Sequence, residues 1–121
     1  MLTRDYVSFE LSPIGDTLTV NLRGEIDHHT ARIFREEIDR ALLRESPRVL
    51  TLDFSEIGFV DSSGIGLIVG RLELAKRIGA TLTIAGLSHR LEQLLELSGV
   101  SRLEGIVISK GKEKESFSHE T

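Results

Sequence analysis

The order of apolar segments from Val49 onward constrains the fold of this chain more than any other feature. The runs Val49–Phe54 and Thr81–Ala85 are short and apolar, as in buried central strands. The segments that follow them repeat apolar residues at helical spacing, one up to Ile78-Gly79 and the other over Ser88–Ser98. Strands that alternate with helices pair in parallel through helical crossovers. This half of the chain therefore predicts an α/β fold.

The first half of the chain predicts an antiparallel hairpin followed by a helix. Tyr6–Ser12 and Thr17–Arg23 alternate apolar with polar residues on either side of a Pro-Ile-Gly-Asp turn, and Gly24 is expected to close the second strand. Apolar residues then recur at helical spacing over Thr30–Arg44. With a short edge strand at Gly105–Ser109, these elements predict a mixed sheet of about five strands with helices packed on it.

Length and composition indicate a single domain over residues 1–109. The chain has 121 residues, of which 40% are hydrophobic, and this is enough to bury one core without disulfides or a structural metal. Residues 110–121 are nearly all polar. We therefore expect them to form a mobile tail.

Charge and missing residue types narrow the classes of function. The formal net charge is −4, and the absence of a Lys/Arg cluster before the tail disfavours a nucleic-acid partner. The absence of cysteine excludes disulfides, thiol catalysis and thiolate metal sites, and it suits a reducing cytoplasm. The N-terminus lacks a signal-peptide core, and no apolar stretch approaches the roughly 20 residues that span a bilayer. We expect a cytoplasmic chain that does not cross a membrane.

Asp61-Ser62-Ser63-Gly64 carries the candidate chemistry, because it lies between a strand and an apolar helix. Short carboxylate and hydroxyl side chains at this position commonly cap the helix by accepting hydrogen bonds from free N–H groups. Two adjacent serines exceed what one cap needs, so one hydroxyl could face a partner. A phosphate on Ser62 would add a charge of about −1.5 to −2, which a helix N-terminus tolerates but a docking surface beside Asp61 would not. On the residues alone, capping and phosphorylation both stay open.

Three blocks of the sequence form a specific combination. They are Gly24-Glu25-Ile26-Asp27-His28-His29-Thr30-Ala31, then Phe59-Val60-Asp61-Ser62-Ser63-Gly64-Ile65-Gly66 with Gly70-Arg71, and Leu97-Ser98-Gly99-Val100. These blocks resemble the anti-sigma factor antagonists of the STAS superfamily, most closely the sporulation sigma-F type. The likeness runs from about Tyr6 to Ile108 and implies a STAS-type single domain. The family usually ends in a helix, whereas residues 110–121 show no apolar periodicity.

The resemblance implies a switch that controls transcription. In the family, the unphosphorylated antagonist binds an anti-sigma factor that is also a serine kinase, and a sigma factor is released. The kinase uses ATP to phosphorylate the first serine of the second block, which corresponds to Ser62, with Ser63 as the fallback; a serine phosphatase restores it. The chain would thus be a substrate of enzymes and not itself an enzyme. It would need no cofactor of its own and would activate sigma-dependent transcription, in sporulation.

The resemblance also implies a partner-binding surface made of the loop before the first helix and the phosphorylated loop. Its residues would be Glu25, Asp27, His28, Asp61, Ser62, Ser63, Gly64 and Ile65. For Asp27, an N-terminal cap near Thr30 is an equally good interpretation. For His28 and His29, a solvated loop is the commoner one.

Enzymatic and ligand-binding alternatives fit the residues less well. Ser62 or Ser63 could act as a nucleophile with His28 or His29 as base, but neither serine fits the Gly-x-Ser-x-Gly pattern. The glycines of Gly64-x-Gly66-x-x-x-Gly70 depart from the spacing of a dinucleotide-binding loop, and close helix packing is the better explanation for Gly70. The adjacent histidines have no further His or Cys nearby to complete a metal site.

A binding role other than sigma-factor control is the runner-up. A STAS domain can serve as a structural adaptor in a stress-signalling assembly or beside a transporter, but the free-standing length and the His-His block favour the sigma-F type. Leu67, Leu74 and Ile78 lie off the main apolar stripe of the second helix. They either complete the core or form an apolar part of the docking surface.

Overall fold

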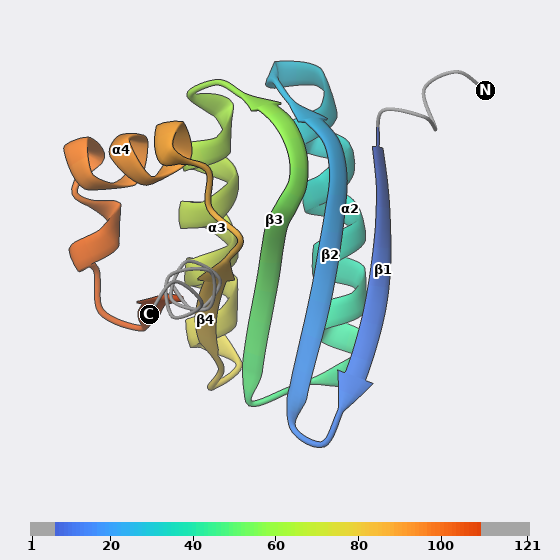
Figure 1. The fold of residues 1–121 in the computed structure, drawn as a ribbon. Coiled ribbons are helices and arrows are strands. Elements are labelled where there is room, and N and C mark those ends of the chain that lie inside the picture. Colours follow the sequence, from blue (N-terminus) through green and yellow to red (C-terminus); the bar gives the residue numbers. More distant parts are fainter. Residues whose placement is uncertain (1–6, 110–121) are drawn as a thin grey trace, which may run out of the picture.

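The computed structural model of the chain describes residues 7–109, which form one sheet with helices packed against it (Figure 1). The sheet has five strands in the order β1-β2-β3-β4-β5. In chain order the elements are β1 (Val7–Ile14), β2 (Thr17–Ile26), α2 (His28–Glu45), β3 (Val49–Val60), α3 (Ser63–Arg77), β4 (Thr81–Ala85), α4 (His89–Ser98), the 3-10 helix η1 (Val100–Arg102) and β5 (Ile106–Ile108).

The sheet is mixed. β1 pairs antiparallel with β2, whereas β2, β3, β4 and β5 pair in parallel with one another. The α/β class predicted from the sequence is confirmed, and the antiparallel pair lies at the N-terminal end as expected. The predicted tail at residues 110–121 lies outside the described residues. None of the helices within residues 7–109 combines the length and apolarity needed to span a membrane.

The core lies between the sheet and the two helices α2 and α3, which run side by side over one face (Figure 1). Burial alternates along the strands, so β3 is buried at Leu50, Leu52 and Phe54 but only partly at the residues between them. The predicted buried central strand at Val49–Phe54 is confirmed as the start of β3, but the strand continues to Val60 and only one of its faces is buried. Its threonine and aspartate belong to the face that α2 and α3 leave uncovered, where polar side chains keep access to water.

Several predicted element boundaries are also corrected. Pro13 and Ile14 belong to β1, and only Gly15 and Asp16 form the turn. Proline is tolerated there because β1 is an edge strand. Gly24 does not close β2, since the strand continues through a register shift to Ile26. Gly24 has a φ of +117°, which glycine adopts without the steric cost that other residues would meet in such a bulge.

The residues off the main stripe of α3 complete the core. Leu67 is 4% exposed, and Leu74 and Ile78 are partly buried against the core cluster. Of the two interpretations of these residues, core packing is therefore confirmed.

Arg71 is a charged side chain in this apolar region. It is only 6% exposed, and its Nε lies 2.7 Å from Oδ1 of Asp39 on α2. Burial is the largest influence on both groups: it raises the pKa of Asp39 above its ordinary value and lowers the pKa of Arg71, while their mutual attraction opposes each shift. The pair joins α2 to α3, because the buried guanidinium of Arg71 on α3 needs the carboxylate of Asp39 on α2 as its partner.

Removing Asp39 should destabilise the protein because it leaves the Arg71 guanidinium buried without its partner. We expect Asp39→Ala to lower the free energy of unfolding by about 2–4 kcal/mol, somewhat below the range for fully buried pairs since Asp39 retains some exposure. The control is Glu37→Ala, which removes the solvent-exposed pair with Arg40 and should cost less than about 1 kcal/mol. Urea unfolding measures both, and equal costs would contradict this role of the buried pair.

The glycines of α3 differ in their surroundings. A Cβ on Gly64 would lie 2.5 Å from Cγ2 of Val60, whereas one on Gly66 or Gly70 would meet nothing within 4 Å. The prediction that close packing explains Gly70 is therefore wrong. The close approach occurs at Gly64, where the first turn of α3 packs against the last residue of β3 and fixes the path of the loop between them.

Alanine should have opposite effects at the two neighbouring glycines. Gly64→Ala forces the buried Val60 to move, and we expect it to cost about 1–3 kcal/mol of stability. Gly66→Ala adds a side chain in open space within a helix and should gain about 0.5–1 kcal/mol. Thermal or urea unfolding distinguishes them; a stable Gly64→Ala protein would show that the packing at Val60 is loose.

Candidate functional site

The two loops of interest meet where β2 and β3 end. Ile26 and Val60 are register partners at the ends of these parallel strands, and the backbone N–H of Asp61 donates to the carbonyl oxygen of Ile26 at 3.1 Å. The carboxyl ends of neighbouring parallel strands share one edge of a sheet. The turn into α2 and the loop into α3 therefore lie side by side, although more than thirty residues separate them in sequence.

Asp27 caps the N-terminus of α2. Its Oδ1 accepts hydrogen bonds from the backbone N–H groups of His29 and Thr30, both at 2.9 Å. The hydrogen bond from the Thr30 backbone is the main reason why the pKa of Asp27 lies below its ordinary value. The capping interpretation of Asp27 is confirmed; whether Asp27 also contacts a partner is a separate question.

Thr30 completes this cap and was not singled out from the sequence as a site residue. Its hydroxyl accepts from the backbone N–H of Asp27 at 3.0 Å and donates to the carbonyl oxygen of Glu25 at 2.7 Å. The side chain is buried, and it fixes the junction between Glu25 at the end of β2 and His28, which begins α2 and does not lie in the predicted solvated loop. The signal was present in the sequence, because an Asp followed three residues later by Thr has the reciprocal spacing of a capping box.

Asp61 satisfies the backbone at the start of α3. Its Oδ1 accepts from the backbone N–H of Ser63 at 2.7 Å, and its carbonyl oxygen accepts from that of Gly64 at 2.9 Å. Ser62 occupies the N-cap position, but its side chain makes no capping hydrogen bond and is exposed. Of the two residues that could have capped this helix, Asp61 takes the role and leaves the Ser62 hydroxyl accessible.

The other predicted site residues surround this loop at different depths. Glu25 and His28 are exposed, Ser63 and Ile65 are half-buried, and Gly64 is buried. Only the exposed members present a whole side chain to a partner, while Gly64 and Ile65 shape the helix beneath.

One exposed aromatic side chain beside the site was not among the predicted contact residues. Phe59 is 47% exposed and is the register partner of Glu25. An exposed aromatic ring next to a polar loop is typical of a protein interface.

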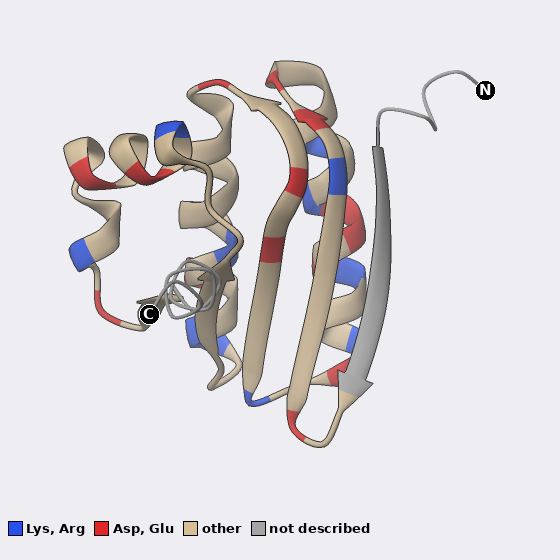
Figure 2. Cartoon of the chain, viewed as in Figure 1, with Lys and Arg blue, Asp and Glu red and all other residues tan. Residues whose placement is uncertain are grey.

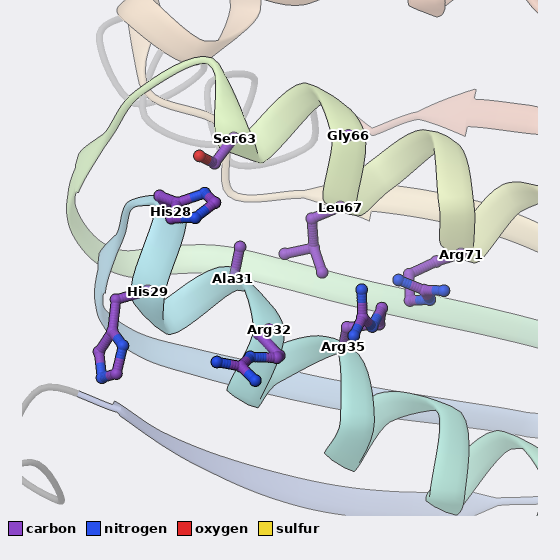
Figure 3. A pocket seen from close by; sticks show the side chains of 9 residues that line it. All are labelled: His28, His29, Ala31, Arg32, Arg35, Ser63, Gly66, Leu67 and Arg71. Atoms are coloured by element: carbon purple, nitrogen blue, oxygen red, sulfur yellow. The ribbon is translucent and has the colours of Figure 1, made fainter.

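An open groove runs between α2 and α3 from this loop (Figure 3). Its volume is about 620 Å³. The lining residues are His28, His29, Ala31, Arg32, Arg35, Ser63, Gly66, Leu67 and Arg71. Sequence reasoning missed the arginines, although the spacing of His28, Arg32 and Arg35 places them on one face of a helix.

The residues of the rival interpretations form neither a hydrogen-bonded catalytic pair nor a metal-binding cluster among the described side chains. His28 and Ser63 both line the groove, but no hydrogen bond joins Ser63 to either histidine among the described residues. Among the side chains described in residues 14–109, no three of His, Cys, Asp or Glu lie close enough to hold a metal ion. That the chain needs no cofactor stays a prediction.

Comparison with known proteins agrees with the resemblance seen in the sequence blocks. The family model for the STAS domain matches residues 8–113. An anti-sigma F factor antagonist of Paenibacillus polymyxa is 34% identical over 86 residues, which cover 71% of this chain and 74% of the relative. An anti-sigma-B factor antagonist of Bacillus subtilis (strain 168) is 32% identical over 83 residues, covering 69% and 74%.

Solved structures share the fold. The anti-sigma factor antagonist SpoIIAA in its unphosphorylated form superposes with a TM-score of 0.70 at 23% identity, covering 94% of this chain and 98% of that one. The Bacillus cell fate determinant SpoIIAA in its phosphorylated form gives a TM-score of 0.65 at 23% identity, covering 92% and 99%. The family model and the curated relatives show that the chain belongs to the STAS domain family, among relatives named as anti-sigma factor antagonists.

Proposed function

We propose that this chain is an anti-sigma factor antagonist controlled by phosphorylation of Ser62. In its unphosphorylated form it binds an anti-sigma factor that is also a serine kinase, and the sigma factor is released. The kinase uses ATP to phosphorylate Ser62, which ends binding, and a serine phosphatase reverses the modification. The chain then acts as a cytoplasmic substrate of these enzymes and not as a catalyst.

The accessible hydroxyl of Ser62 carries this proposal. Asp61 accepts the hydrogen bond that the first turn of α3 needs, so the capping interpretation no longer accounts for Ser62. Ser63, the fallback, is half-buried and donates its backbone N–H to Asp61. A kinase would reach Ser62 more easily than Ser63.

The position of Ser62 also explains how a phosphate could block binding without unfolding the chain. The phosphate would sit at the N-terminus of α3, where the helix dipole and backbone N–H groups tolerate an anion. It would add a charge of about −1.5 to −2 beside Asp61 and near Asp27, the two carboxylates at the paired strand ends. A partner docked on this surface would meet that charge and its tightly held water, so binding would be lost while the fold persists.

The regulated sigma factor is proposed to be of the sporulation F type. Relatives that antagonise anti-sigma F and anti-sigma-B factors show similar identities to this chain, 34% and 32% in the two cases given above. Identity alone therefore does not separate them. The preference rests on the His28-His29 block.

We expect the genome-neighbour anti-sigma kinase and ATP to phosphorylate the purified protein on Ser62. Tandem mass spectrometry locates the phosphate, and Ser62→Ala should abolish it while Ser63→Ala retains it. The kinase must first be shown to be active on a generic substrate. Absence of phosphate from both serines would refute the switch and favour the alternative function, a STAS adaptor domain in a stress-signalling assembly.

Asparagine at position 27 should separate capping from partner contact. Asn caps helices about as well as Asp, so Asp27→Asn should change the free energy of unfolding by less than about 0.5 kcal/mol, whereas Asp27→Ala should cost about 1 kcal/mol. If the Asp27 charge contacts the partner, Asp27→Asn should raise the Kd for the anti-sigma factor at least about tenfold. Isothermal titration calorimetry measures this binding.

The pH dependence of stability provides the control for the cap. Because the pKa of Asp27 in the folded protein lies below its ordinary value, the ionised cap stabilises the fold at neutral pH, and this contribution is lost as the pH falls through that lowered pKa. Asp27→Asn should lose less stability than the wild type on acidification. Wild-type affinity in Asp27→Asn would show that Asp27 only holds the turn.

A further inference from the structure

The groove between α2 and α3 carries positive charge from arginines. Its lining includes Arg32, Arg35 and Arg71 but no Asp or Glu. The chain as a whole has a formal net charge of −4, so this surface is opposite in sign to the molecule that bears it. Figure 2 shows the arginines of α2 as blue bands, with the red bands of Asp and Glu on the same helix.

Two of the arginines are not neutralised within the described structure. Arg71 has Asp39 as its partner, but neither Arg32 nor Arg35 forms an ion pair with any side chain described in residues 14–109. Both are exposed. Arg35 is close enough to influence the pKa of both Arg71 and Asp39, so a second guanidinium lies beside the buried pair.

The geometry suits an elongated anionic partner. His28, Arg32 and Arg35 follow one another at spacings of four and three residues, so they form a row about 10 Å long on one face of α2. Ala31 also lines the groove and can contact the methylene groups of an incoming segment, whereas Leu67, which lines it too, belongs to the core (Figure 3). An enclosed small-anion site would converge several donors on one point, whereas Arg32 and Arg35 are exposed along an open groove.

We propose that this groove binds an acidic segment of the anti-sigma kinase, with at least two carboxylates that pair with Arg32 and Arg35. The proposal rests on the proposed function and adds to it the chemistry of the docking partner. Guanidinium groups form planar, bidentate hydrogen-bonded pairs with carboxylates, so the contact has a preferred geometry as well as an electrostatic attraction.

The groove also gives phosphorylation a second physical effect. Ser63 forms the end of the groove, one residue after the proposed phosphorylation site. A phosphate on Ser62 would repel an acidic segment at its point of entry and would compete with that segment for the same cations. Both effects act against the same partner.

The test is charge reversal of the two free arginines. Arg32→Glu/Arg35→Glu should raise the Kd for the unmodified anti-sigma factor at least about 30-fold. The binding of this variant should also depend less on salt concentration than that of the wild type. Arg32→Lys/Arg35→Lys, which keeps the charge, should recover most of the affinity. The matched control is Arg40→Glu/Arg44→Glu, with the same change of charge farther along α2 and outside the groove; it should stay within about threefold of the wild type. Calorimetry gives the affinities, and circular dichroism melts verify that each variant is folded.

Each outcome decides the proposal. Equal binding by the groove variant and the wild type would overturn the acidic-segment proposal and leave the antagonist function intact. Equal losses in the groove and control variants would reveal only long-range charge and would also overturn it. If the isolated protein binds ATP, and Arg32→Glu/Arg35→Glu abolishes this binding, the groove would be assigned to a small anion instead. Failure of the wild type to bind the anti-sigma factor would refute the antagonist function itself, and with it this inference.

Discussion

Parallel pairing of β2 with β3 is the constraint on which the rest of the site depends. The two strands end together at Ile26 and Val60, so each delivers its following loop to the same edge of the sheet. A backbone hydrogen bond from Asp61 to Ile26 extends the pairing one step beyond the strands. A shift of this register would separate the turn at Asp27 from the loop at Ser62, and no local preference of either loop could bring them back together.

Two aspartates at the paired strand ends then have the same role, each at the start of one helix. Asp27 and Asp61 each accept hydrogen bonds from the first backbone N–H groups of the helix that follows. Because these carboxylates, with Thr30 at the first helix, satisfy the helix ends, the side chains of Ser62 and His28 are not required for capping. Ser62 and His28 are left exposed on a rigid base, as a binding surface requires.

The sequence predicted the element order and the α/β class because apolar periodicity reports directly on burial. It placed β4 at the correct residues but ended β2 at Gly24, because a glycine that permits a bulge within a strand looks the same as one that ends it. Periodicity also could not show that Gly64, and not Gly70, makes the close contact, since that depends on the position of Val60 across the loop. Likewise, the block around Ser62 was recognisable, but its residue types did not show that Asp61, and not Ser62, accepts the hydrogen bond from the start of α3.

The central claim is that Ser62 is a local switch whose phosphorylation changes the surface and not the fold. The most direct measurement compares amide NMR spectra of the unphosphorylated and the stoichiometrically phosphorylated protein. We expect chemical-shift changes confined to the two loops and the groove, about residues 25–35 and 60–67, with the amides of β4 and α4 unchanged. Shift changes throughout the core, or a loss of spectral dispersion, would contradict the account.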